Sequence, residues 1–446
     1  MIYPRLNYPG YGELQEPLGL LYIAASLEQA GFTVELVDLT LAESHAVLDD
    51  PLRRTDVVGL GCSTALFSRA LATLEYIREQ KPGVPVIIGG PHATACPEDV
   101  IEKGFDFAVI GEGDITTAEL ITRLASGQDP HRTPGVICRH NGELVQGEKR
   151  PFVADIDSLP FPARHLLDYS PYIEKGMFHI GMFVSRGCPY RCTFCKPMQD
   201  MLFGKKIRIR SPASVAREMK AAVELMGERL FLFRDDTMAG FGPAWFEEFR
   251  EARKQAGIEN LHWSCQARVD QIHPEILTIM KSNGCLGIAF GVESGSQKIL
   301  DYYRKQMTVE DTIRAFDLCH QFGIGTHAFI MMGAPVETRE DLEKTVNLVK
   351  RIRPESISLS ITTPAPGSAL YDEAMAQGII NYQTYEDTDY FLNQEPMRLE
   401  HLNRDDMAWA HAEILKLVPD TFHLQHFQAQ QRRWQAQKLK PDHVSK

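Results

Sequence analysis

Short apolar runs alternate with amphipathic stretches over the first 125 residues of the chain. Apolar residues that recur every three to four positions predict helices, and the short apolar runs between them predict strands. In chain order the expected elements are helix 19–30, strand 34–37, strand 57–60, helix 68–79, strand 86–88, strand 107–110 and helix 116–125. Strands and helices that alternate in this way indicate a doubly wound parallel sheet with helices on both faces.

A second alternating series begins near Met182. Its apolar runs predict strands at residues 182–185, 230–233, 262–265, 286–290, 326–330 and 356–361. The amphipathic stretches that alternate with them predict helices, for example at residues 214–226, 245–255, 274–282, 308–321 and 339–351. Six strand–helix pairs are fewer than the eight that close a full barrel. We therefore expect a partial (β/α)6 TIM-like barrel with catalytic groups at the carboxyl ends of its strands.

Other segments have a different pattern. Prolines replace the periodicity over residues 128–178, which predicts a stiff, extended linker. Beyond residue 375 the alternation ends, and we expect helices at 405–417 and 422–440. The aromatic residues just before these helices could close the barrel mouth over a substrate or simply pack it; they are Tyr382, Tyr385, Tyr390 and Phe391. The expected division is a first domain at 1–127, a linker at 128–178, a barrel at 179–375 and a helical C-terminal region at 376–446.

Composition narrows the class of protein. The 446 residues suffice for two to three domains. A net charge of -12 disfavours a nucleic-acid-binding protein, because neutralising phosphates needs clustered cations, so we expect a small-molecule substrate. Nine cysteines, three of them grouped, favour a reducing compartment, the cytoplasm. The chain starts without an export pattern and has no run of 18 apolar residues, so no integral membrane segment is expected.

The grouped cysteines are Cys188, Cys192 and Cys195, in a loop that also contains Gly187 and Pro189. Such a short loop, here called the claw (residues 186–195), can turn three thiolates toward one metal centre. Three ligands leave one coordination position open. This favours a 4Fe-4S cluster that binds a further molecule.

Two other interpretations of the claw remain. Structural zinc would need a fourth ligand close by, and the next cysteine, Cys265, lies about 70 residues further on. A non-catalytic iron–sulfur electron carrier would leave the acidic strand ends of the barrel unexplained. Phe194, inside the claw, would shield a cluster from water, which suits iron–sulfur chemistry better than a surface zinc site.

The C-x3-C-x2-C spacing of the claw resembles the radical S-adenosylmethionine (SAM) family. The resemblance implies a 4Fe-4S cluster whose open iron is chelated by the amino and carboxylate groups of SAM. It also implies that one electron cleaves SAM to a 5′-deoxyadenosyl radical. That electron would come from an external reductant of the flavodoxin or ferredoxin type.

Three glycine-rich loops follow the predicted strands of the first domain: 61–64, 89–94 and 111–114. Each loop, considered alone, has the residue types of an ordinary tight turn. Placed together ahead of the claw, they resemble the Rossmann-like cobalamin-binding domain at the front of one radical SAM subfamily. The resemblance implies cobalamin contacts at Ser63, Thr64, Gly89, Gly90, Glu112 and Gly113.

One signature of other cobalamin proteins, D-x-H-x-x-G, is missing from the sequence. Radical SAM members often lack the histidine ligand that this motif supplies, so cobalamin is still expected. A member that kept the domain and lost the cofactor would show the same loops. We expect His92 to pack or to hydrogen-bond rather than to bind cobalt.

Polar residues follow the strands of the second series. The resemblance implies that Asp235 and Asp236 contact the SAM amino group, with a capping pair as the alternative. Arg268 suits the SAM carboxylate, although an ion pair would serve as well. Glu293 and Ser294 match the family's ribose-contacting segment, with a buried structural glutamate as the alternative.

Two further segments match the family. Residues 331–337 resemble the region that lines the adenine, although they would also serve as ordinary core. Residues 364–371 resemble a Pro-Gly-Ser element of cobalamin-type members and indicate no chemistry of their own.

The expected function is cobalamin-dependent methylation of an unactivated carbon in a small metabolite or natural-product intermediate. The alternative keeps the radical step without methyl transfer, with or without bound cobalamin, and leads to dehydration, cyclisation or rearrangement. One example is a diol dehydratase that acts on an aminoglycoside-type sugar. No residue of the sequence is identified as a catalytic acid or base.

Overall fold

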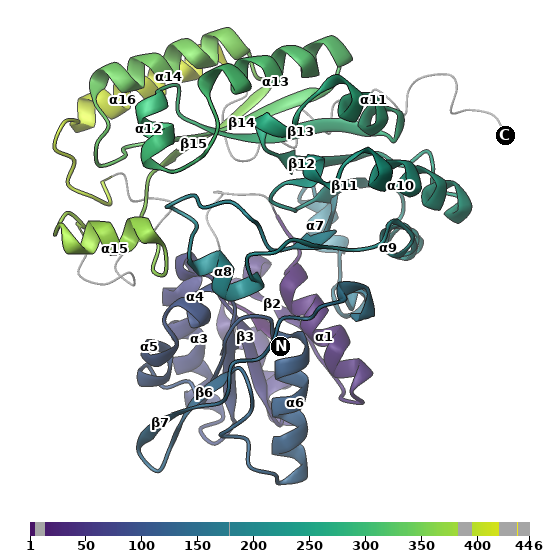
Figure 1. The fold of residues 1–446 in the computed structure, drawn as a ribbon. Helices are drawn as coiled ribbons and strands as arrows, with labels where there is room; N and C mark the ends of the chain where they lie inside the picture. The colour runs from purple at the N-terminus through teal and green to yellow at the C-terminus, as the bar shows by residue number, and fades with distance from the viewer. Residues whose placement is uncertain (5–13, 178, 382–394, 419–434, 436–446) are drawn as a thin grey trace.

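The computed structural model describes residues 1–4, 14–177, 179–381, 395–418 and 435. Two α/β domains lie one above the other, and helix α8 (Met198–Phe203) lies at their boundary (Figure 1). Among the described residues, no helix is long and apolar enough to cross a bilayer.

The first domain is built on one mixed sheet, with strand order β2-β1-β3-β4-β5-β6-β7 in the described part of the chain. Its strands are β1 (Ile2–Tyr3), β2 (Val37–Asp38), β3 (Val58–Gly61), β4 (Val86–Gly89), β5 (Phe107–Val109), β6 (Val136–His140) and β7 (Glu143–Gln146). β1 to β5 pair in parallel, as the alternation predicts. β3 and β4 are almost wholly apolar because helices cover both faces of the sheet.

Helices cover this sheet on two sides. α1 (Leu18–Gln29) and α6 (Gly113–Ser126) pack together on one side. In Figure 1 the helices α3, α4 and α5 lie on the other side. The remaining helices of the domain are α2 (Asp49–Arg54), α3 (Phe67–Gln80), α4 (Pro91–Ala95) and α5 (Pro97–Glu102).

The expected linker at 128–178 is partly wrong. β6 and β7 fall inside it and pair antiparallel at the edge of the first sheet, so the domain extends to about residue 146. The prediction missed this hairpin because β7 is mostly exposed and lacks an apolar pattern. The expected strand 34–37 is also displaced, since β2 begins only at Val37.

The second domain confirms the partial barrel. Its strands, in the order β15-β14-β13-β12-β11-β8 within the described residues, are all parallel. They are β8 (His179–Met182), β11 (Leu230–Phe233), β12 (Trp263–Ala267), β13 (Cys285–Glu293), β14 (Gly325–Met332) and β15 (Ser356–Ile361). A separate antiparallel pair, β9 (Ser185–Arg186) and β10 (Arg208–Ile209), flanks the claw.

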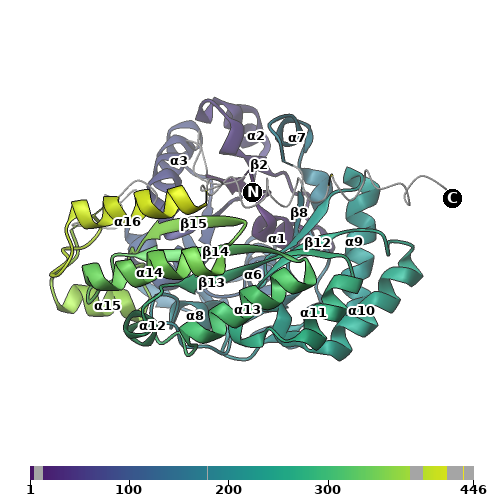
Figure 2. The same ribbon diagram turned by 90° about the horizontal axis from the view of Figure 1, so that it is seen from above.

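The helices of the barrel line the outer face of its sheet (Figure 2). They are α9 (Pro212–Met226), α10 (Pro243–Ala256), α11 (Pro274–Ser282), α12 (Gln297–Tyr302), α13 (Val309–Phe322) and α14 (Arg339–Ile352). α7 (Ser170–Glu174) precedes the barrel, and α15 (Ala369–Ala376) and α16 (Arg404–Leu417) follow it. α16 confirms the helix expected at 405–417; the expected helix at 422–440 and the aromatic group at 382–391 lie outside the described residues, apart from residue 435.

A buried ion network joins the two domains. Arg164 donates to Glu16, which precedes α1, at 2.5 Å and to Glu218 of α9 at 3.1 Å. It also donates to the Gly181 carbonyl of β8 at 2.7 Å. All three charged side chains are less than 5% exposed. Because buried charges are stable only when they are paired, this network fixes how the domains meet.

Candidate functional site

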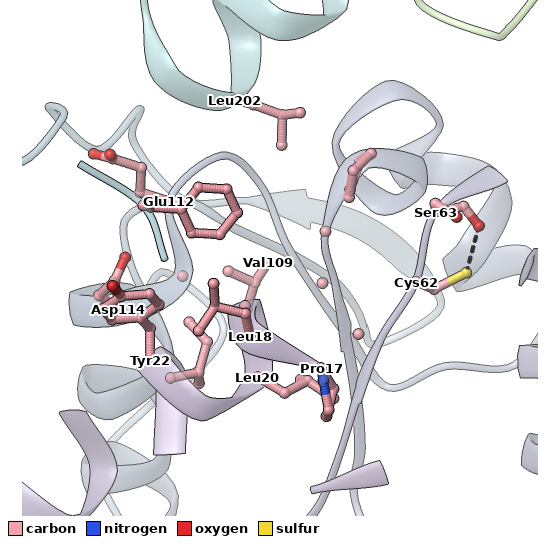
Figure 3. A pocket seen from close by; sticks show the side chains of 18 of the residues that line it. Pro17, Leu18, Leu20, Tyr22, Cys62, Ser63, Val109, Glu112, Asp114 and Leu202 are labelled. Carbon is pink, nitrogen blue, oxygen red and sulfur yellow. Dashed lines mark hydrogen bonds between the residues drawn. The ribbon is translucent and has the colours of Figure 1, made fainter. Parts of the chain in front are cut away.

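A cavity of about 470 Å³ lies between the carboxyl ends of β3, β4 and β5 and the barrel. Its first-domain wall includes Ser63, Gly89 and Gly90, and its barrel wall includes Asp235 and Asp236. Figure 3 shows Leu202 of α8 facing Leu18 and Leu20 of α1 across it. Most of the wall is apolar, so a ligand placed there is shielded from water.

The glycine loops bring backbone close to the cavity. Gly90 has a positive φ of 102°, and a Cβ at this position would lie 2.7 Å from the Cys62 carbonyl oxygen. A side chain would therefore push the two loops apart. The result is a wall of bare backbone, which a large flat ligand can approach. This arrangement fits the corrin ring of cobalamin.

The two hydroxyls of the first loop have different places. Ser63 lines the cavity, but Thr64 lies 3.2 Å from Nδ1 of buried His92. His92 also packs against Phe67, with ring centroids 3.9 Å apart, and burial lowers its pKa to about 4. His92 thus has the hydrogen-bonding role expected from the sequence.

Glu112 has a role that sequence reasoning missed. Its carboxylate accepts hydrogen bonds from Arg208 at 2.8 and 3.0 Å and from Arg186 at 3.1 Å. Arg186 also reaches Asp114 through two bonds of 2.7 and 3.0 Å. Since Arg186 begins the claw, these bonds tie the third glycine loop to the claw. Two features of the sequence could have suggested this contact: Arg186 directly before Gly187, and Asp114 in the first turn of α6.

The claw is anchored from two other parts of the barrel. The Thr193 N–H donates to the Tyr303 carbonyl at 2.9 Å, and the Thr193 carbonyl accepts from Leu370 at 3.0 Å. Ala369 donates to the Lys196 carbonyl at 2.7 Å. The 364–371 segment, which indicated no chemistry in the sequence, therefore holds the claw in place.

The claw thiols are partly buried. Burial raises the pKa of Cys195 to about 12 and also raises the pKa of Cys188. Among the described side chains, no three from His, Cys, Asp and Glu come close enough to hold a single metal ion. Thiolates around a four-iron cube lie further apart than the ligands of one ion, so the claw is compatible with a 4Fe-4S cluster.

Asp235 and Asp236 follow β11 but face different partners. Asp235 is 2% exposed and accepts bonds from the N–H of Val184 at 3.0 and 3.1 Å and from the Ser185 hydroxyl at 2.5 Å. Burial raises its pKa to about 7. These bonds hold the chain that leads into the claw.

Asp236 is the better placed of the two acids to accept a ligand's ammonium group. It accepts a bond from the Gln199 amide of α8, and both residues line the cavity. Burial raises the pKa of Asp236, while nearby Lys196 and Lys305 oppose this shift.

Arg268 packs against the claw. Its guanidinium lies 3.7 Å from the centre of the Tyr190 ring, a cation–π contact, and it donates to Asp270 at 2.9 and 3.0 Å. Gln271 donates to the Tyr190 hydroxyl at 3.0 Å. Arg268 thus makes the ion pair considered as its alternative role, while also contacting the loop that carries the three thiols.

Glu293 ends β13 in the left-handed region, with φ at 62°, which is strained for a residue other than glycine. Its carboxylate accepts from buried Lys305 at 2.6 Å, and the Lys305 ammonium lies 5.5 Å from the Phe194 ring of the claw. Ser294 lies 3.1 Å from the Thr345 hydroxyl of α14, so it fixes the loop.

The structure therefore brings together only part of the expected site in the cavity. Ser63, Gly89, Gly90, Glu112, Gly113, Asp235 and Asp236 all line it. Thr64, Arg268, Glu293, Ser294 and the three claw cysteines do not. Arg268 and Glu293 instead approach the claw through Tyr190 and Lys305.

Family comparison divides the chain in the same way. Residues 182–349 match the model described as the radical SAM superfamily, and residues 11–121 match the B12 binding domain. The order of the two matches is the order of the two domains seen in Figure 1.

Curated relatives cover most of the chain. An uncharacterised methyltransferase, PH0819, of Pyrococcus horikoshii is 28% identical over 89% of this chain and 86% of its own length. The anaerobic magnesium-protoporphyrin IX monomethyl ester cyclase of Cereibacter sphaeroides is 27% identical over 83% of this chain and 62% of its own. The hopanoid C-3 methylase of Methylococcus capsulatus is 27% identical over 79% of this chain and 67% of its own length.

Solved structures share the fold. The radical SAM methyltransferase TsrM of Kitasatospora setae, with cobalamin and a [4Fe-4S] cluster bound, superposes with a TM-score of 0.74 at 19% identity. The match covers 94% of this chain and 88% of that one. The cobalamin-dependent enzyme OxsB, with aqua-cobalamin and SAM bound, also gives 0.74, at 17% identity, over 92% and 65% of the two chains.

Proposed function

We propose that this chain, which belongs to the radical SAM enzymes that carry an N-terminal cobalamin-binding domain, methylates an unactivated carbon of a small organic molecule. Its cofactors are a 4Fe-4S cluster, SAM and cobalamin. When bound, the cluster and SAM supply a 5′-deoxyadenosyl radical and cobalamin supplies the methyl group. The protein binds and orients these groups and keeps water away.

The observation that carries this proposal is the shared cavity. Its first-domain wall consists of glycine loops suited to cobalamin, and its barrel wall includes Asp236, next to the claw. Methyl transfer requires a substrate carbon that reaches both the radical and the methyl group. A single apolar cavity that touches both domains meets this requirement.

Several side chains would have defined roles. Cys188, Cys192 and Cys195 would hold the cluster, and Asp236 would accept the SAM ammonium group. Glu293 would accept hydrogen bonds from the ribose hydroxyls of SAM in addition to the one that it accepts from Lys305. Ser63, Gly89, Gly90 and Gly113 would face cobalamin with backbone and one hydroxyl. We also propose an external one-electron reductant of the flavodoxin or ferredoxin type and a cytoplasmic location.

The test is anaerobic incubation of protein reconstituted with iron, sulfide and hydroxocobalamin. SAM and a chemical reductant are added, and 5′-deoxyadenosine and S-adenosylhomocysteine are measured separately. We expect both products. Formation of 5′-deoxyadenosine alone would contradict methyl transfer and favour dehydration, cyclisation or rearrangement.

Cys192→Ala should reduce the iron content and bring 5′-deoxyadenosine formation to background, because only two claw thiolates remain. The matched control is Cys96→Ala, which removes a thiol outside the claw and should leave iron content unchanged. Full nucleoside formation by Cys192→Ala would contradict the role of the claw.

A further inference from the structure

A buried lysine is enclosed by the thiol loop. Lys196 directly follows Cys195, the last cysteine of the claw, and its side chain is buried. Its backbone N–H donates to the Cys192 carbonyl at 3.0 Å, and its ammonium donates to the Cys188 carbonyl at 2.8 Å. Lys196 thus reaches from the last cysteine of the claw back to the first. A positive charge is therefore fixed against the loop that carries the three thiols.

The place of this ammonium is set by its surroundings. A lysine side chain usually keeps its ammonium in water, which its flexible four-carbon stem allows. Here the ammonium also donates to Asp200, one turn further along in α8, and the Lys196 carbonyl accepts from Ala369 at 2.7 Å. Pro197, the next residue, forms an isolated bridge with Ser368. These contacts hold the lysine at the claw instead of in solvent.

Asp200 neutralises the ammonium only in part. The side chain of Asp200 is 19% exposed, whereas that of Lys196 is 9% exposed. Lys305, the other lysine near the claw, pairs instead with Glu293, whose side chain is only 7% exposed. Because solvent screens a more exposed charge more strongly, the field of Asp200 is weakened more than the field of Lys196. The pair therefore leaves a net positive effect on the claw.

A positive charge beside an iron–sulfur cluster favours its reduced form. The three claw ligands bind as thiolates, so the site is already rich in negative charge, and reduction adds one more. The Coulomb attraction to a fixed cation is therefore stronger after reduction than before it. Local charge, hydrogen bonds to the sulfurs and solvent exposure are the means by which proteins set the reduction potential of such clusters.

We infer that the Lys196 ammonium raises the reduction potential of the cluster held by the claw and that Asp200 limits this increase. The inference rests on the proposed function, because the charge affects a potential only where the claw holds a redox cluster. In the step concerned, one electron passes from a one-electron reductant to the cluster, and no bond forms or breaks. Lys196 acts through its charge and takes no part in the chemistry of SAM.

The test is a redox titration of the full-length protein reconstituted with iron and sulfide. Dithionite is added with redox mediators, and the reduced cluster is measured by electron paramagnetic resonance. At the potential where half of the cluster is reduced in the unmodified protein, we expect a reduced-to-oxidised ratio of at most about one third in Lys196→Met. Lys196→Arg keeps the charge, so its ratio should stay within about twofold of the unmodified protein.

Asp200→Asn should shift the ratio in the opposite direction. The asparagine leaves the ammonium in place and removes the carboxylate that opposes it, so we expect the ratio to rise at least about threefold. A loop that is merely loosened gives no reason for easier reduction. This variant therefore separates a charge effect from a structural one, and it serves as the test if Lys196→Met does not hold a cluster.

The matched control is Lys205→Met. Lys205 is exposed just beyond α8, and its replacement removes the same charge from the same part of the chain. Since solvent screens an exposed charge, we expect the ratio to stay within about 1.5-fold of the unmodified protein. Equal shifts in Lys205→Met and Lys196→Met, or a ratio that falls or does not change in Asp200→Asn, would overturn the inference.

The titration separates this inference from the proposed function, because it requires no SAM, cobalamin or substrate. Opposite shifts in Lys196→Met and Asp200→Asn support the inference even where no methylated product is formed. A cluster whose reduction is the same in every variant overturns the inference and leaves the proposed function intact. Reconstituted protein that contains no 4Fe-4S cluster contradicts both.

Discussion

Glu337 illustrates how one buried carboxylate sets a local backbone. It is 1% exposed, and one of its oxygens accepts from the N–H groups of Gly333 at 2.6 Å and Ala334 at 3.1 Å. Burial raises its pKa to about 7, with a further rise from Asp341, while the two backbone bonds and Lys298 oppose the shift. The residue thus shapes the 331–337 segment that resembles the adenine-lining region.

This predicts a pH-dependent stability difference for Glu337→Gln. A folded-state pKa of about 7, above the ordinary 4.5, means that the folded protein keeps a proton that the unfolded chain releases. The contribution of Glu337 to the free energy of unfolding is therefore complete below about pH 4.5 and is lost as the pH rises through 7. A glutamine keeps an acceptor without titrating. We expect Glu337→Gln to be more stable than the unmodified protein by about 1–3 kcal/mol at pH 8 and similar at pH 5.

Urea unfolding between pH 5 and 8 checks this prediction. The matched control is Glu340→Gln in the first turn of α14, where the glutamate side chain is 77% exposed. The free energy of unfolding of Glu340→Gln should equal that of the unmodified protein at every pH. Identical pH slopes for both variants would contradict the raised pKa.

At the scale of elements, the loop after β13 is pressed against α14. The Gly295 N–H donates to the Thr345 hydroxyl at 3.0 Å, and the Ser296 hydroxyl donates to Asp341 at 2.6 Å. A Cβ on Gly295 would lie 2.4 Å from the Lys344 carbonyl oxygen. Because this contact is with backbone, the helix and the loop cannot both keep their places if a side chain is added. The loop carries Ser294 and follows Glu293, so its position sets part of the proposed SAM site.

We therefore expect Gly295→Ala to lower the free energy of unfolding by about 2–3 kcal/mol, as overpacking against a rigid neighbour does. Gly83→Ala is the control, since a Cβ there meets nothing within 4 Å. That control should lie within about 0.5 kcal/mol of the unmodified protein. The midpoint of urea unfolding measures both. A Gly295→Ala variant as stable as the control would show that the loop is not tightly packed on α14.

At the scale of the whole molecule, the Arg164 network decides how the two domains face each other. Glu16 comes from the first domain and Glu218 from the barrel, while Arg164 lies between the domains in sequence. The Tyr169 hydroxyl adds a bond of 2.6 Å to Glu16. The shared cavity exists only while this junction is held, because its walls come from both domains.

Replacing Arg164 by Ala leaves two buried carboxylates without their shared cation. We expect a loss of about 3–5 kcal/mol and two separate calorimetric unfolding transitions in place of one. A triple variant, Arg164→Met with Glu16→Gln and Glu218→Gln, removes the charges on both sides and should recover part of the loss. A single transition at an unchanged temperature in Arg164→Ala would contradict the role of the network.

The sequence alone was enough to determine the two α/β domains, the positions of five of the six barrel strands to within a few residues and the position of the claw after the first strand. That first strand was predicted three residues too late, at 182–185, whereas β8 spans His179–Met182. Periodicity and cysteine spacing are local properties, so they can be read without knowing the fold. β11, β15 and α11 begin and end at the residues that were predicted.

Only the tertiary structure decided which charged residues meet. Glu112 lines the cavity as expected, but the sequence did not indicate that its carboxylate also bonds to Arg186 and Arg208, 74 and 96 residues away. Asp235 was paired with Asp236 in the prediction, but its carboxylate holds Val184 and Ser185. The β6–β7 hairpin joined the first sheet although β7 has no apolar pattern to reveal it. Such pairings depend on where distant segments come together, which no local spacing in the chain encodes.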